Sequence, residues 1–170
     1  MRRYLVFSAK TPVLLLSFIV TALLLLVVFP ALPLGAPLLD TLPGYSPLEA
    51  RELLARYGPE GRRLYAIASP TLDTLLPLCY VTFFAGAVHR CGLPERAWWL
   101  ALLPLLVGIW DLAENLQITL LLLSYPDIAD GQILWASFFT WYKGAVLIPA
   151  LLLLLVLALI YRASRRFRHD

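Results

Sequence analysis

Four long apolar stretches divide the chain into candidate membrane spans. They cover about residues 12–30, 66–88, 97–124 and 132–161, and each could cross a hydrocarbon layer of about 30 Å as a helix. The last two exceed the minimum length, so we expect them to tilt or to emerge beyond the bilayer. The pattern predicts an all-α integral membrane protein, a four-helix bundle that forms a single transmembrane domain over residues 1–170.

The connection between the first two stretches contains a short amphipathic pattern. Its run SPLE at 46–49 is typical of a helix start, with Ser46 as the N-cap and Glu49 closing a capping box. Gly58 is expected to end this helix, which covers about 47–57. Because its apolar and charged side chains lie on different sides, we expect the helix to lie on the outer surface, as a lid over the mouth of the bundle.

Composition and charge support the membrane assignment. Hydrophobic residues make up 61% of the chain and charged residues 15%, whereas soluble domains average about 45–50% and about 25%. This difference excludes an ordinary soluble domain, a disordered chain and a nucleic-acid-binding arm. The first apolar run is longer than the apolar core of a signal peptide, so we expect an uncleaved anchor.

The distribution of Lys and Arg predicts the orientation. Nine of them lie in the N-terminal segment, the 89–96 loop and the C-terminal tail, and four lie in the 31–65 loop. The richer side is expected in the cytoplasm. The 31–65 loop also holds four acids, Asp40 among them, and is neutral overall. We therefore expect a multi-pass protein of the cell inner (plasma) membrane with both termini cytoplasmic.

The third stretch contains the strongest chemical signal, the run DLAEN at 111–115. Asp111, Glu114 and Asn115 are spaced i, i+3, i+4 and so project from one helix face. Carboxylates within a membrane are costly and nearly always turn toward a partner or a cavity. Like charges in such a site cannot all stay ionised without partners. We therefore expect an inward-facing site in which at least one buried acid is protonated at neutral pH.

The second stretch adds an acid at similar depth. Asp73, Pro77 and Tyr80 fall on one face of a helix. An alternative is that the helix restarts at Ser69-Pro70-Thr71, which would make Asp73 a residue of its electropositive first turn.

The fourth stretch supplies a basic partner. Lys143 lies roughly 16 Å inside the outer end of this stretch, which matches the depth of the two acids of the third stretch. Thr140 and Trp141 are its neighbours, and Gly144 is expected to allow close helix approach.

These residues define one candidate site in the outer half of the bundle. Its charged core, from which a general acid or base would come, consists of Asp73, Asp111, Glu114 and Lys143. The residues expected to shape the ligand-binding space are Tyr80, Asn115, Thr140 and Trp141. The chain contains two histidines, no metal-ligand spacing around its cysteines and no known hydrolase motif, so we expect neither a metal nor a cofactor.

The leading hypothesis is a site that binds or processes a small molecule or a lipid headgroup. The expected partners are membrane lipid and a small amphiphilic ligand, with a homo-oligomer or a larger membrane complex as further options and no nucleic acid. Two other functions stay open, a proton- or cation-coupled small transporter and an accessory structural subunit. In a transporter the charged residues would carry protons, and in a structural subunit they would only hold the helices in register.

The motifs at 58–65 (GPEGRRLY), 73–80 (D-x-x-x-P-x-x-Y) and 111–115 (D-x-x-E-N) resemble those of small four-span bacterial membrane proteins of uncharacterised function. The similarity covers about residues 44–160 and implies an architecture without an activity. A weaker likeness links the chain to sterol-isomerase-like membrane families, which bind amphiphiles in a bundle lined with acids and aromatics. The order of the motifs differs there, so the likeness assigns no role to any residue.

Overall fold

Helices dominate residues 1–166, the part of the chain that the computed structural model describes. Four of them are long and apolar enough to cross a membrane: Thr11–Val28, Gly58–Arg90, Glu95–Ser124 and Asp130–Arg165. No strand occurs in the described residues. This confirms the predicted all-helical class and the four apolar helices. Residues 167–170, which include Arg168 of the predicted basic tail, lie outside the described part.

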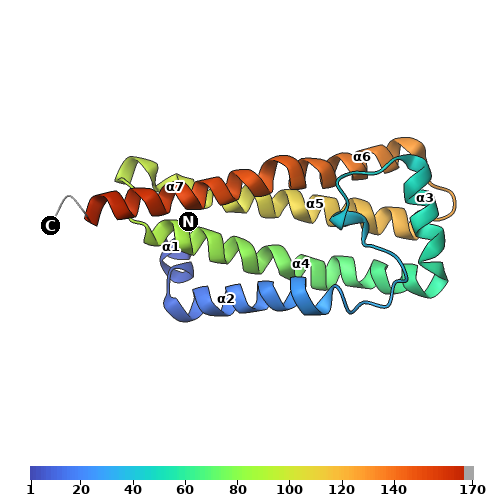
Figure 1. Cartoon of the computed structure of the whole chain (residues 1–170), viewed down its shortest axis with the longest axis horizontal. Helices are drawn as coiled ribbons and strands as arrows, with labels where there is room; N and C mark the ends of the chain where they lie inside the picture. The colour runs from blue at the N-terminus through green and yellow to red at the C-terminus, as the bar shows by residue number, and fades with distance from the viewer. Residues whose placement is uncertain (167–170) are drawn as a thin grey trace.

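Shorter elements link and extend these helices (Figure 1). The chain runs through α1 (Arg2–Ser8), α2 (Thr11–Leu23), η1 (Leu24–Val28), η2 (Leu39–Thr41), α3 (Pro47–Arg56), α4 (Gly58–Arg90), η3 (Glu95–Leu102), α5 (Leu103–Ser124), α6 (Asp130–Tyr142), η4 (Lys143–Leu147) and α7 (Ile148–Arg166). In Figure 1, α1 and the last turns of α7 lie at one end of the molecule and α3 lies at the other.

Two helices contain a wider π-helical turn just before a proline. η1 precedes Pro30, and η4, which joins α6 to α7, precedes Pro149. A proline has no N–H, and its ring clashes with the carbonyl of the fourth residue before it. In η4 the N–H of Ile148 bonds the carbonyl of Lys143 five residues earlier. The widened turn therefore begins at Lys143, and such turns are frequent at functional sites.

The predicted short helix is confirmed as α3, with its capping box. The N–H of Ser46 donates to Glu49 Oε2 over 2.7 Å, and the N–H of Glu49 donates to Ser46 Oγ over 3.3 Å. The first of these bonds holds the pKa of Glu49 below its usual range. Gly58 follows with a φ of +64°, a conformation that favours glycine.

Replacing Ser46 by alanine should loosen α3, because one bond of the capping box is lost. We expect a cost of about 1 kcal/mol in the local stability of α3. Hydrogen–deuterium exchange of residues 47–57 in detergent measures it. Ser164→Ala, at an exposed serine near the end of α7, is the matched control. Equal exchange in the two variants would contradict a capping role for Ser46.

The second long helix begins at Gly58, earlier than the predicted residue 66, and runs without interruption through Pro70 and Pro77. The alternative of a helix restart at Pro70 is therefore wrong, and Asp73 is an interior helix residue. The hydroxyl of Ser69 donates to the carbonyl of Asn115 over 3.1 Å, which ties this section of α4 to α5.

Close helix approach occurs at glycines other than the predicted one. A Cβ on Gly86 would lie 2.2 Å from the carbonyl oxygen of Ser8 in α1, and a Cβ on Gly108 would lie 2.7 Å from Val81 Cγ2 in α4. Nothing lies within 4 Å of a Cβ built on Gly144. The prediction of close approach at Gly144 is wrong, because this residue faces open space.

Candidate functional site

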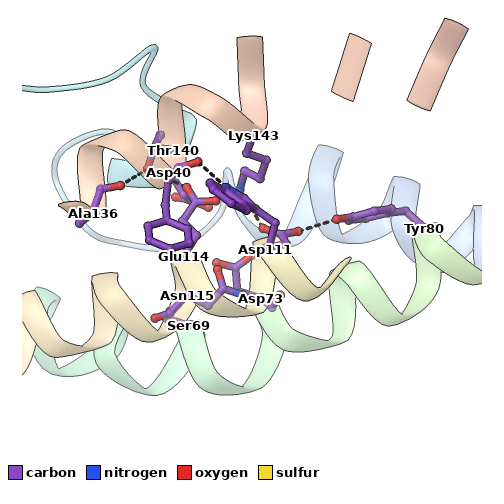
Figure 2. Close-up of polar contacts among 12 residues, drawn as sticks. Asp40, Ser69, Asp73, Tyr80, Asp111, Glu114, Asn115, Ala136, Thr140 and Lys143 are labelled. Carbon is purple, nitrogen blue, oxygen red and sulfur yellow. Dashed lines mark hydrogen bonds and ion pairs between the residues drawn. The ribbon is translucent and has the colours of Figure 1, made fainter. Parts of the chain in front are cut away.

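Lys143 bridges the two acids of α5 (Figure 2). Its Nζ lies 2.9 Å from Asp111 Oδ1 and 2.6 Å from Glu114 Oε2. The side chains of Asp111 and Glu114 are 2% and 0% exposed, and that of Lys143 is 12% exposed. The structure therefore places these three predicted residues in one buried ion-pair network, with the lysine as its most accessible member.

Two hydroxyl groups hold the carboxylates from the other side. Thr140 Oγ1 donates to Glu114 Oε1 over 2.7 Å, and Tyr80 OH donates to Asp111 Oδ2 over 3.0 Å. Each carboxylate thus has one oxygen on Lys143 and the other on a hydroxyl. Thr140 and Lys143 are spaced i, i+3 and share a helix face. This arrangement fixes the orientation of both acids and, through them, the position of the lysine ammonium.

Asp73 and Asn115 form a separate contact between α4 and α5. Asn115 Nδ2 donates to the backbone carbonyl of Asp73 over 2.9 Å. Both side chains are buried, and among the described residues the carboxylate of Asp73 has no hydrogen bond. The side-chain oxygen of Asn115 is also buried without a partner there. Asp73 therefore lies near the lysine network in Figure 2 but does not pair with Lys143.

A pocket of about 510 Å³ opens beside the lysine. Its wall consists of Asp40, Thr41, Leu42, Pro43, Thr140, Trp141, Lys143, Gly144, Ala145 and Ile148. Trp141 is 48% exposed and Ile148 is 43% exposed, so the pocket reaches the surface. Glu114 and Asp111 are not part of this wall. Of the predicted residues, only Thr140, Trp141 and Lys143 line the pocket.

Asp40 is the residue of this pocket that the sequence did not reveal. It was one of four acids in a neutral loop, and nothing in the pattern distinguished it from the others. In the structure Tyr65 OH donates to Asp40 Oδ1 over 2.8 Å, and the neighbouring Leu39 is fully buried. η2 contacts α5 and α6, so the loop folds back against the helices. Residues 40–43 therefore form one side of the pocket wall, and α3 is not among the residues that line the pocket, so its role as a lid stays a prediction.

Buried tyrosines hold this loop in place. The N–H of Tyr45 donates to Ser137 Oγ over 2.8 Å, and Tyr57 OH donates to the carbonyl of Pro37. Burial raises the pKa of both phenols well above their usual range, so both stay neutral. The loop is thus a fixed wall of the pocket.

The chemistry available at the pocket centres on Lys143. An ammonium has three N–H donors. Asp111 Oδ1 accepts one of them, and Glu114 Oε2 forms an ion pair with the same ammonium. An N–H that neither acid engages is available to an acceptor on the side of the pocket. Glu114 and Asp111 have no surface on the pocket, so a proton exchanged with a ligand would pass through Lys143. Within residues 1–166 no three His, Cys, Asp or Glu side chains are grouped so as to hold a metal ion.

Fold and site together define a helical membrane protein with a buried acid–lysine network beside an open pocket. No protein-family model, no curated protein and no solved structure matches the chain. The resemblance to small four-span bacterial proteins and the sterol-isomerase likeness therefore stay predictions.

Proposed function

We propose that the protein is a four-helix transmembrane bundle that binds the polar headgroup of a small molecule or lipid at the pocket beside Lys143. The four apolar helices support the bundle. An inner-membrane location with both termini cytoplasmic is part of the proposal, supported by the excess of Lys and Arg at the N-terminal segment, the 89–96 loop and the tail. In Figure 1, α1 and the last turns of α7 lie at the same end, as this orientation requires.

The observation that carries the proposal is the position of the Lys143 ammonium. It is held by two buried carboxylates, and Lys143 also lines a pocket that reaches the surface. A network that served packing alone would gain nothing from a pocket beside its only base. Ligand sites typically combine an apolar wall with a few fixed polar groups, which is the composition of this pocket.

The buried residues divide into two roles under this proposal. Lys143 contacts the ligand, while Asp111, Glu114, Tyr80 and Thr140 position its ammonium. A general acid or base role for Glu114 or Asp111 is a further proposal, and it requires transfer through Lys143 because neither acid reaches the pocket. Asn115 belongs to the contact between α4 and α5 rather than to the ligand surface.

Native mass spectrometry of the detergent-purified protein tests the proposal. We expect a discrete adduct on the wild type that falls several-fold in Ala145→Phe, because the new ring fills the pocket without changing a charge. Glu114→Gln should also weaken it, because the lysine loses one of its charged partners. Asp127→Asn, at an exposed acid of the 125–131 loop, is the control. The absence of an adduct, or equal adducts in all four proteins, would overturn the proposal and favour a structural network.

A further inference from the structure

The long helices differ greatly in length. α2 with η1 spans 18 residues, or about 27 Å, whereas Asp130–Arg165 spans 36 residues, or about 54 Å. A hydrocarbon layer is about 30 Å thick. α2 with η1 is therefore just long enough to cross it, and Figure 1 shows α4 and α6 continuing beyond the end of α2 on the side of α3.

Two observations place the pocket at the edge of the hydrocarbon layer. Asp40 also lines a second pocket, of about 310 Å³, together with Phe29 and Pro30 at the outer end of this first span. On the last helix, Trp141 and Tyr142 precede an apolar run at 144–160 that is about 26 Å long. Trp and Tyr concentrate at the level of lipid headgroups. These positions indicate that Asp40 and Lys143 lie close to this level, nearer the outer surface than the roughly 16 Å that the fourth apolar stretch predicts for Lys143.

The pocket presents one group of each charge. Lys143 has a free N–H donor, and Asp40 Oδ2 has no hydrogen bond among the described residues, since Tyr65 occupies Oδ1. A ligand that satisfies both needs an acceptor for the lysine and a donor for the carboxylate. An anionic headgroup alone would face Asp40 unfavourably, and a cation alone would face Lys143 unfavourably.

The apolar part of the wall indicates an amphiphile. Trp141, Ala145 and Ile148 lie on the exposed side of the helix, and apolar, largely exposed side chains continue from them along α7. In a membrane this surface faces acyl chains. A lipid could therefore place its headgroup at Lys143 and Asp40 while its chains follow α7.

We propose that this pocket binds a zwitterionic aminophospholipid of the outer leaflet, with its phosphate at Lys143 and its primary ammonium at Asp40. The inference rests on the proposed function and adds the class of ligand. It also assigns Asp40 a direct contact with the ligand.

Lipid retention in a defined mixture tests this assignment. The protein is equilibrated with equal amounts of phosphatidylethanolamine, phosphatidylcholine and phosphatidylglycerol, and bound lipid is identified by native mass spectrometry. We expect phosphatidylethanolamine to exceed the other two roughly ten-fold, the scale of one charge-assisted hydrogen bond. Asp40→Asn should abolish the preference, while its amide oxygen can still accept from Tyr65. Asp127→Asn should keep the preference, and the melting temperature of each variant verifies folding.

The outcomes separate this inference from the proposed function. Preferential retention of phosphatidylglycerol or phosphatidylcholine, or an unchanged preference in Asp40→Asn, would overturn the aminophospholipid assignment and leave the headgroup site standing. Displacement of bound lipid by millimolar soluble phosphoethanolamine would show that a soluble ligand with the same headgroup chemistry occupies the pocket. It would overturn the proposal that the ligand is a lipid. Retention of no lipid, together with no adduct on the purified protein, would overturn the proposed function itself.

Discussion

Lys143→Met is expected to destabilise the protein by about 3–5 kcal/mol, the usual cost of removing one partner of a buried ion pair. The methionine fills a similar volume, but Asp111 and Glu114 would then face each other across an apolar side chain, with no counter-ion among their present contacts. Both would have to take up protons or draw in water. Thermal unfolding in detergent, followed by circular dichroism, measures the loss.

A compensated variant separates charge from packing. Lys143→Met combined with Asp111→Asn and Glu114→Gln removes every charge of the network and should recover most of the stability, because neutral side chains need no counter-ion. Lys10→Met, at an exposed lysine before α2, controls for the substitution itself. A Lys143→Met protein as stable as the Lys10→Met protein would show that the ion pairs contribute nothing.

The ion-pair network could be predicted because it depends on local periodicity. The spacing of Asp111 and Glu114 places them on one face of any helix, and counting along the fourth apolar stretch places Lys143 at a matching depth. The cost of a lone charge in a membrane then favours contact between Lys143 and acids at its depth, but it does not predict that Asp73 stays outside the ion pairs. None of these steps needs knowledge of how the loops fold.

The pocket could not be predicted, because its second wall comes from a distant part of the chain. Asp40 reaches it only because Leu39 is buried and the loop folds back against α5 and α6. The sequence shows a proline-rich connection with balanced charge, which is compatible with many paths. For the same reason the capping signals predict the bounds of the short helix α3 correctly, but they do not determine where it lies relative to the pocket.

The packing around each glycine also depends on distant parts of the chain, so the local sequence does not predict it. Both Gly86 and Gly144 lie in apolar helical sequence, and no pattern distinguishes them. The difference is their surroundings, since Gly86 packs directly on the backbone of α1 and Gly144 faces open space. The two glycines therefore form a matched pair for an experiment.

Gly86→Ala is expected to separate α1 from α4. Its new methyl group would lie 2.2 Å from the carbonyl oxygen of Ser8 and 2.5 Å from the carbonyl carbon. A backbone atom cannot rotate away as a side chain can, so α1 has to shift. Arg90 resists that shift, because its Nε donates to the carbonyl of Ala9 over 2.6 Å. We expect a net loss of about 1–3 kcal/mol, the scale of overpacking in a filled core.

Gly144→Ala is the control for this prediction. Alanine by itself stabilises a helix by about 0.8–1.0 kcal/mol relative to glycine. Both substitutions gain this term, but only Gly86→Ala meets a backbone. Gly144→Ala should therefore raise the melting temperature while Gly86→Ala lowers it, and hydrogen exchange of residues 2–8 should increase only in the latter. A rise in both variants would mean that α1 does not pack on α4 at Gly86, and equal exchange would lead to the same conclusion.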